Sequence, residues 1–280
     1  MKIYKTKTTI VVLHNDEYYS SPLKWDEFIN RKGLHAFILS EFKNWKKLSN
    51  GAQLIASELL APIDTQEVWA AGVTYYRSMV ARAEESKQSG GSTFYDKVYE
   101  AERPEIFFKA TPHRVANPTE EVFIRKDSTW NVPEPELTLY INSEGNIEGY
   151  TIGNDMSSRS IEGENPLYLP QAKTYDRSAA LGPCLYVPSS PIPPETTISM
   201  EIVRKGKQVF NDSVQISKMK RTHTELASFL FRECSFPTGA FLMTGTCIVP
   251  PNDFTLNIGD VVSIHIDHIG TLTNTIKEKK

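Results

Sequence analysis

Short apolar runs separated by Gly, Pro and Asn dominate the chain from Val68 onward. The runs are rich in β-branched and aromatic residues, which is typical of strands. The runs that we predict to be strands are residues 68–73, 106–110, 122–125, 137–141, 150–152, 198–203 and 261–266. The pattern therefore predicts a β-dominated protein.

Helical periodicity is confined to fewer segments. The clearest helix begins at Thr222, whose spacing to Glu225 is that of a capping box, and apolar residues follow on one helical face. Two further helices are predicted at residues 78–87, with the glycine pair 90–91 ending the helix, and at residues 96–102. Strand runs outnumber helices, so the predicted fold class is α+β.

The first sixty residues have a different pattern. Residues 2–13 predict a strand followed by a polar turn, and residues 25–48 carry aromatics and Leu at loosely helical spacing. Pro62 marks a boundary. We expect a small N-terminal domain at residues 1–62 and a larger β-dominated domain at residues 63–280.

Composition narrows the class of protein. The 280 residues are 40% hydrophobic and 23% charged, and the net charge of −3 with a pI of about 6.1 gives no basic footprint for nucleic acid. Three cysteines are too few for a disulfide framework, which fits a reducing cytoplasm. The first apolar run is too short for a signal peptide, and no stretch approaches the ~18 apolar residues of a spanning helix. We expect a cytoplasmic protein without nucleic-acid or membrane partners.

Three acidic residues near strand ends form a candidate metal site. Glu134 and Glu136 would project to one face of a strand, and Pro135 between them suits a strand start, an edge or a bulge. For these two glutamates alone, a solvated surface pair is the alternative. Asp155 follows the next predicted strand. Three carboxylates without Cys or His at metal spacing favour a hard cation over zinc, with Mg²⁺ first and Mn²⁺ or Ca²⁺ as alternatives. Lys173, after a proline-rich loop, is our candidate for offsetting the remaining charge, with a solvated surface lysine as the alternative.

Five motifs then occur in an order that resembles the fumarylacetoacetate hydrolase family, whose metal-dependent enzymes act on 2-oxo acids and β-dicarbonyls. The motifs lie at residues 72–75, 134–136, 149–159, 173–183, and 244–246 with 258–260. The resemblance implies a mixed β-sheet roll or partial barrel with a small N-terminal domain, and a homo-oligomer, either dimer or tetramer. It also implies that Glu134, Glu136 and Asp155 ligate the metal, that Lys173 is the active-site lysine, and that Thr246 contacts a small 2-oxo acid substrate.

Within the family, residues 103–110, 130–136 and 162–173 resemble a branch of sugar-acid dehydratases more than the hydrolases. Many family hydrolases place a water-activating histidine shortly after the Gly-x-x-Tyr motif, and this chain has Ser78 there. Ser160 replaces an aspartate often seen after the Ser-Ser-Arg run, which bears on loop contacts rather than on the metal. The departure at Ser78 weakens a hydrolase assignment.

The resemblance implies loss of water from a 2-keto-3-deoxy sugar acid through a metal-stabilised enolate. Glu105 is our candidate base, because strand alternation places it beside Phe107 and an acid next to an aromatic is partly desolvated. The alternatives for Glu105 are an exposed strand acid or a partner of Lys109.

Polar residues after the first strand of the larger domain are candidates for substrate binding. Thr74, Arg77 and Arg82 lie there, and one arginine would hold the substrate carboxylate. We favour Arg82, because Arg77 lies nearer the turn of the motif.

Other functions stay open at this point. One is an acylpyruvate hydrolase or a 2-oxo-acid decarboxylase of the same family. Another, of a different class, is a catalytically idle sugar-acid binding protein that has kept the metal site. The presence of Glu105 and Lys173 beside three putative ligands argues against an idle protein.

Overall fold

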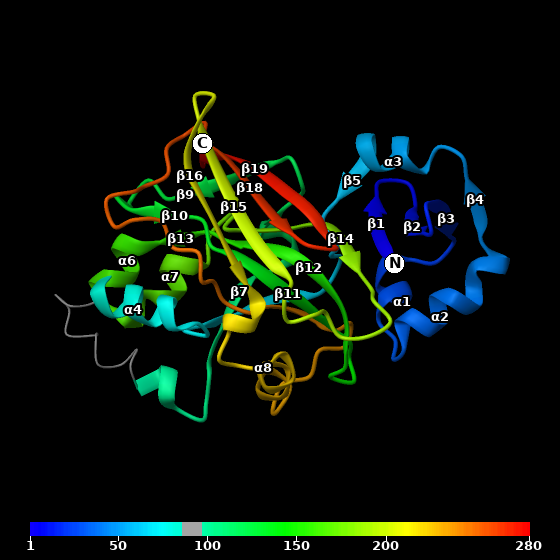
Figure 1. Cartoon of the computed structure of the whole chain (residues 1–280), viewed down its shortest axis with the longest axis horizontal. Coiled ribbons are helices and arrows are strands. Elements are labelled where there is room, and N and C mark those ends of the chain that lie inside the picture. The colour runs from blue at the N-terminus through cyan, green and yellow to red at the C-terminus, as the bar shows by residue number, and fades with distance from the viewer. Residues whose placement is uncertain (86–96) are drawn as a thin grey trace.

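The protein is described from a computed structural model, which covers residues 1–85 and 97–280 (Figure 1). Its N-terminal segment, residues 1–62, lies at one end of the molecule. The strands of this segment are β1 (Lys2–Thr6), β2 (Ile10–His14), β3 (Glu17–Ser21), β4 (Lys46–Leu48) and β5 (Leu59–Leu60). Its helices are α1 (Trp25–Ile29), α2 (Leu34–Glu41) and α3 (Gly51–Glu58).

Two large sheets make up the rest of the molecule, and the first continues into the N-terminal segment. The remaining strands of this main sheet are β6 (Glu67–Gly72), β7 (Glu105–Ala110), β8 (Val115–Ala116), β11 (Pro135–Ile141), β12 (Ile147–Asp155), β14 (Ala179–Tyr186) and β17 (Ala240–Met243). The second sheet consists of β9 (Glu121–Ile124), β15 (Thr197–Arg204), β16 (Lys207–Gln215), β18 (Val261–Ile266) and β19 (Gly270–Glu278). A short ladder pairs β10 (Asn131–Val132) with β13 (Ser157–Ser158).

The described residues give the main sheet twelve strands in the order β4-β3-β2-β1-β14-β12-β11-β17-β6-β7, with β5 on β1 and β8 on β14. The pairs β17·β6 and β14·β8 are parallel, and the other pairs of this sheet are antiparallel. The two end strands, β4 and β7, do not pair with each other, so the sheet is an open roll and not a closed barrel. The predicted β-dominated α+β fold with a mixed sheet is confirmed.

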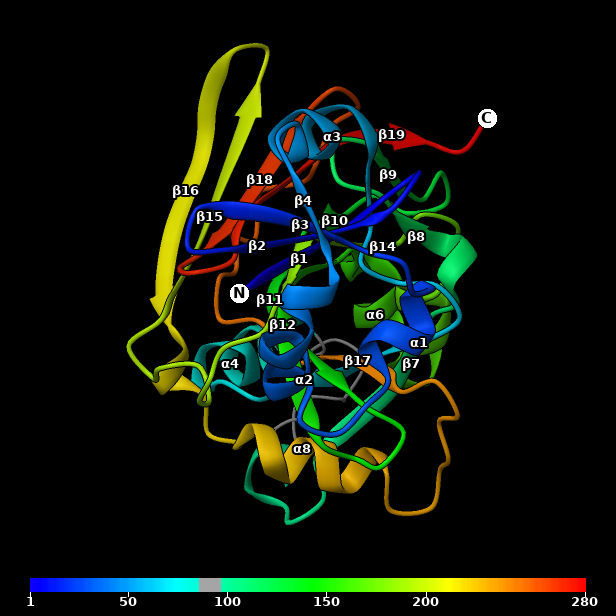
Figure 2. The same cartoon turned by 90° about the vertical axis from the view of Figure 1, so that its right-hand side faces the viewer.

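The main sheet separates two hydrophobic cores. Leu137 and Leu139 of β11 point into a core shared with the second sheet, while Tyr140 points into a core that the helices of the N-terminal segment cover. Because both faces are covered, all seven residues of β11 are buried. Figure 2 shows the second sheet with its β15–β16 hairpin extending from the body.

The helices α4 (Tyr76–Glu85), α6 (Arg159–Glu164) and α7 (Leu169–Lys173) lie around the end of the main sheet where β11 begins and β12 ends. The helix α8 (His223–Leu230) lies beside the turn that joins β11 to β12. The capping box of α8 is confirmed, because the Thr222 side chain accepts from the Glu225 amide and the Glu225 side chain accepts from the Thr222 amide. In the described residues, no helix combines the length and apolar character needed to cross a membrane.

Each of the seven predicted strands corresponds to an observed one, namely β6, β7, β9, β11, β12, β15 and β18. The prediction of one strand over residues 2–13 was wrong, because residues 7–9 turn the chain between β1 and β2. The helix predicted at residues 78–87 corresponds to α4, but its last two residues and the glycine pair 90–91 lie outside the described residues. The first residue of the helix predicted at 96–102 lies outside them too. The domain boundary near Pro62 stays a prediction; β1 pairs with β14 across it.

Candidate metal and catalytic site

Three buried carboxylates meet where β11 begins and β12 ends. Glu136 is the second residue of β11 and Asp155 is the last of β12, while Glu134 immediately precedes β11. The antiparallel register sets Glu136 opposite Gly153, and the Asp155 amide donates to the Glu134 carbonyl at 2.9 Å. One carboxylate oxygen from each acid lies within 4.8 Å of the others, and each acid is at most 3% exposed. Two neighbouring strands thus bring together acids that are about twenty positions apart.

Cationic side chains contact these carboxylates directly. Lys173 Nζ donates to Glu134 Oε2 at 2.5 Å and to Asp155 Oδ2 at 3.2 Å, and Arg159 donates to Glu134 Oε1 at 2.6 Å. Lys109 Nζ lies 2.5 Å from Asp155 Oδ1. Both lysines are 0% exposed. Three cationic side chains therefore contact Glu134 and Asp155 in a site that is nearly closed to solvent.

The surroundings act differently on the acids. Burial raises the pKa of Glu136 well above its usual value, and the nearby charges of Asp155 and Glu134 add to this effect. Burial would also raise the pKa of Asp155, but Lys109 and Lys173 outweigh it and hold that pKa below its usual value. The Gly245 amide donates to Glu136 Oε2 at 2.6 Å and partly satisfies its carboxylate.

This donor set fits a hard divalent cation. Glu134, Glu136 and Asp155 offer oxygen ligands only, and among the described residues they are the one cluster of three such acids. Oxygen ligands from carboxylates suit Mg²⁺, Mn²⁺ or Ca²⁺, whereas structural and catalytic zinc sites use Cys or His. The three acids would hold the cation, and Lys173 would lie next to two of them, Glu134 and Asp155.

A narrow cavity opens onto the cluster. It has a volume of about 10 Å³, and its wall includes Gly72, Ser78, Arg82, Phe107 and Thr246 besides the charged residues. A volume of that size holds about one water molecule. A ligand larger than water can therefore enter only if side chains of the wall move.

The predicted substrate-binding residues lie in or behind this wall. Arg82 of α4 forms a buried ion pair with Glu162 of α6, and the Thr246 hydroxyl donates to the Ile248 carbonyl at 3.3 Å. The Thr74 hydroxyl donates to the Thr244 carbonyl at 2.7 Å, so it supports the turn that carries Thr246. Their substrate contacts stay predictions.

Glu105, the predicted base, is the first residue of β7. Glu105 does not itself form part of the cavity wall. Its carboxylate lies against Gly72, and Gly72 is one of the residues of the wall. Its Oε2 atom is buried and has no hydrogen-bond partner within the described parts of the chain. The sequence left open an ion pair between Glu105 and Lys109. In the structure Lys109 forms its ion pair with Asp155 instead.

Sequence reasoning missed part of the charged cluster. Lys109 was considered only as a partner of Glu105, and Arg159 only as part of a motif. The signal for Lys109 was present, since strand alternation predicts it on the face of Glu105 and Phe107. Arg159 and Glu162 lie three residues apart on α6 and so share a helix face, which was also readable.

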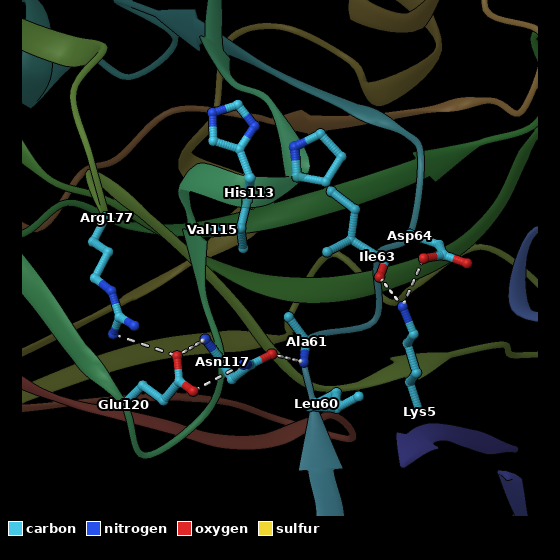
Figure 3. Close-up of a pocket in the computed structure, with 11 residues that line it drawn as sticks. Lys5, Leu60, Ala61, Ile63, Asp64, His113, Val115, Asn117, Glu120 and Arg177 are labelled. Atoms are coloured by element: carbon cyan, nitrogen blue, oxygen red, sulfur yellow. Dashed lines mark hydrogen bonds and ion pairs between the residues drawn. The ribbon is translucent and has the colours of Figure 1, made fainter. Parts of the chain in front are cut away.

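A larger cavity of about 420 Å³ lies away from the carboxylate cluster, beside the N-terminal segment (Figure 3). Its charged side chains are paired with one another: Lys5 contacts Asp64 and the Ile63 carbonyl, and Arg177 contacts Glu120. These pairings occupy the charged side chains of the cavity wall, Lys5, Asp64, Glu120 and Arg177.

Comparisons with known proteins show which family the chain resembles in sequence. The sequence model described as fumarylacetoacetate (FAA) hydrolase C-terminal matches residues 68–277. A Haloferax volcanii protein named probable 2-keto-3-deoxyxylonate dehydratase is 50% identical over 77% of this chain and 73% of its own length. A Saccharolobus solfataricus protein named 2-dehydro-3-deoxy-D-arabinonate dehydratase is 42% identical over 85% of this chain and 80% of its own length.

Solved structures are similar over the whole chain. The apo form of 2-keto-3-deoxy-D-arabinonate dehydratase has a TM-score of 0.86 and 36% identity, with 100% of both chains covered. A structure of 2-keto-3-deoxy-D-arabinonate dehydratase complexed with magnesium and 2,5-dioxopentanoate has a TM-score of 0.85 and 35% identity at the same coverage. Sequence and fold together show that the chain belongs to the fumarylacetoacetate hydrolase family.

Proposed function

We propose that the protein is a Mg²⁺-dependent hydro-lyase that converts 2-keto-3-deoxy-D-arabinonate to 2,5-dioxopentanoate and water. The observation that carries this proposal is the buried cluster of Glu134, Glu136 and Asp155 beside Lys173, in a chain similar to dehydratases over most of its length. In the D series, the xylonate and arabinonate names denote one compound. C2 has become a ketone and C3 a methylene, so only the C4 centre that the two sugars share remains.

The residues of the site divide the proton transfers between them. Glu105 Oε2, buried without a hydrogen-bond partner among the described residues, takes a proton from C3 of the substrate. Lys173 Nζ, fixed by its contacts with Glu134 and Asp155, donates a proton to the C4 hydroxyl, which leaves as water. Further proton shifts convert the C5 carbinol into an aldehyde without redox chemistry. When bound, Mg²⁺ supplies Lewis-acid stabilisation of the negative charge that develops on the 2-oxo acid.

Two further side chains position the substrate. Arg82 lines the cavity and its ion pair with Glu162 limits its orientations, so it binds the substrate carboxylate. Thr246 presents a hydroxyl in the same wall and contacts the substrate there, while Thr74 supports the turn behind it.

The direct test is product analysis with purified protein, Mg²⁺ and 2-keto-3-deoxy-D-arabinonate. We expect loss of water and an aldehyde product, measured by coupling to an aldehyde dehydrogenase, and no turnover after chelation of the metal. Glu134→Gln should lose both turnover and Mg²⁺ affinity, whereas Glu201→Gln, at an exposed position on β15, should keep both.

Other products would identify the competing functions. Cleavage of a C–C bond would support an acylpyruvate hydrolase or a 2-oxo-acid decarboxylase. Calorimetric binding of the sugar acid and Mg²⁺ without any product would indicate an idle binding protein. Full activity of Glu134→Gln would contradict the ligand assignment.

We also propose that the protein works as a homo-oligomer in the cytoplasm. The proposal of an oligomer follows from the resemblance to the fumarylacetoacetate hydrolase family, and Leu167, Tyr76 and Ile258 are exposed apolar side chains that a second copy could cover. The free thiols of Cys184, Cys234 and Cys247 suit a reducing compartment. Light scattering after gel filtration should give the mass of a dimer or a tetramer; a monomer at micromolar concentration would contradict the proposal.

A further inference from the structure

Lys109 is a completely buried lysine whose ammonium group has three acceptors. It lies on β7, where the register with β6 shifts between Phe108 and Ala110, and it is 0% exposed. Its Nζ lies 2.5 Å from Asp155 Oδ1, and it donates to the Met156 carbonyl at 2.9 Å and to the Lys173 carbonyl at 2.5 Å. The ammonium group thus makes two hydrogen bonds to backbone carbonyls and one ion pair with a carboxylate.

These acceptors belong to two separate parts of the site. Asp155 and Met156 form the end of β12 and the residue after it, and Lys173 is the last residue of α7. The two oxygens of the Asp155 carboxylate are divided between two lysines, Oδ1 facing Lys109 and Oδ2 facing Lys173. One ammonium group therefore links the strand that carries an acid of the cluster to the helix that carries the catalytic lysine.

Packing alone does not account for a lysine at this position. Removing an ammonium group from water costs several kcal/mol, and a buried ion pair can often be replaced by apolar side chains of similar volume without loss of stability. Methionine has a similar length and would fill the same space. The value of Lys109 must therefore lie in what its ammonium group holds in place.

We infer that Lys109 is a positioning residue that fixes the Asp155 carboxylate and the Lys173 backbone relative to each other. The inference rests on the proposed function, because it assigns Asp155 to the metal and Lys173 to proton transfer. Held by Lys109 through Oδ1, Asp155 keeps Oδ2 beside Lys173, whose Nζ also contacts Glu134. Held through its carbonyl, Lys173 keeps its Nζ within reach of the same acids.

Two opposing effects of Lys109 on the metal can be separated by experiment. Its positive charge repels a divalent cation, so a role of charge alone predicts that removing it tightens Mg²⁺ binding. A positioning role predicts the reverse, because an unconstrained carboxylate is a poorer ligand. Loss of such an outer partner typically weakens metal affinity or activity by about 10- to 100-fold.

The test is Lys109→Met in the full chain, with the Mg²⁺ Kd measured by titration calorimetry and kcat measured at saturating Mg²⁺. We expect a Kd at least about tenfold weaker and a kcat at least about tenfold lower. Lys5→Met is the matched control, since Lys5 also contacts an aspartate, Asp64, and a backbone carbonyl, that of Ile63, far from the cluster (Figure 3). The control should leave both quantities unchanged.

A second variant keeps the test decisive if Lys109→Met does not fold. Lys109→Gln retains a hydrogen-bond donor in the buried site but lacks the reach and charge of lysine, and the same losses are expected. A folded variant with Kd and kcat within twofold of the parent would overturn the inference. Tighter Mg²⁺ binding with unchanged kcat would overturn it as well, because Lys109 would then act only as an opposing charge.

The inference can fail independently of the proposed function. If the parent protein does not dehydrate the sugar acid, the Mg²⁺ Kd of the two Lys109 variants still tests the positioning of Asp155. Exchange of the C3 protons of 2-oxobutyrate with deuterated water, followed by NMR, reports proton removal by Glu105 beside the bound cation without requiring loss of water, so slower exchange in the Lys109 variants would follow from a misplaced Asp155 carboxylate.

Discussion

Glu136 and Asp155 belong to one cluster, yet their neighbours shift their pKa values in opposite directions. Glu136 is buried beside two other acids, which favours its protonated form, whereas Lys109 and Lys173 stabilise the ionised form of Asp155. For single residues, the protonation of each acid therefore depends on which lysine or arginine contacts its carboxylate. The acid triad alone does not specify that.

Glu105 depends on an adjacent glycine for its position. The first prediction at this scale is that Glu105→Gln lowers kcat by about 100-fold or more while Mg²⁺ affinity stays unchanged, because the amide cannot accept the C3 proton. Gly72→Ala should also lower kcat, since a Cβ there would collide with the Glu105 carboxylate. Turnover and calorimetry measure the two effects separately.

Gly206→Ala is a suitable control for Gly72→Ala on steric grounds, because nothing lies within 4 Å of a Cβ at Gly206. Its φ of +75° makes it strained, so any loss of stability there should leave kcat unchanged. A Glu105→Gln protein with more than a tenth of parental kcat would contradict the assignment of the base.

At the scale of elements, α8 shows how packing of a helix can create pH dependence. Its first residue, His223, packs 6.1 Å from the Tyr150 ring and lines a cavity beside β12. Burial lowers the pKa of His223 from 6.5 to about 4. The folded protein therefore binds fewer protons at this residue than the unfolded chain between these two pH values.

This pKa shift predicts acid destabilisation. The free energy of unfolding should fall as the pH is lowered from 6.5 to 4, and His223 should account for on the order of 2–3 kcal/mol of that loss. His223→Phe keeps an aromatic ring against Tyr150 and removes the titration, so its stability should depend less on pH. Urea unfolding at pH 7 and pH 4.5 measures the difference.

His265 provides the comparison for this experiment, because its side chain is half exposed. His265→Phe should retain the acid destabilisation of the parent. If His223→Phe and the parent lose equal stability between pH 7 and 4.5, the effect arises elsewhere.

At the scale of the whole molecule, the N-terminal segment is tied to the main sheet by a carboxylate as well as by β1. Glu148 of β12 accepts the amides of Gly33 and Leu34, both at 2.9 Å, and Asn142 donates to it at 3.2 Å. Gly33, with a φ of +70°, is the N-cap residue of α2, so Glu148 caps that helix from a distant part of the chain. The negative charge of Glu148 at the N-terminus of α2 also interacts favourably with the helix dipole.

We predict that Glu148→Ala lowers the free energy of unfolding by about 1–2 kcal/mol, because two helix amides lose their acceptor. Urea denaturation measures the loss, and faster hydrogen exchange at Gly33 and Leu34 locates it. Glu144→Ala, at an exposed position before β12, should change neither. Equal stability of the two variants would contradict the capping role.

The sequence by itself predicted the strands that have a clear apolar run, such as β6 and β11, and the helix with a capping box. It did not predict β14 or β17. β14 contains a Gly-Pro pair that argues against a strand, and β17 is a four-residue run whose burial depends on its neighbours β11 and β6. Local pattern decides an element only when the element carries its own periodicity.

The same division applies to the site. Motif, spacing and family resemblance predicted the acids Glu134, Glu136 and Asp155 as a site for a hard cation, and the structure brings the three acids together. Only the tertiary structure decided that Lys109, from a strand at the far edge of the main sheet, reaches Asp155. The physical reason is that a chain specifies residue types and local geometry, whereas contacts between distant segments depend on the strand order and register that packing selects.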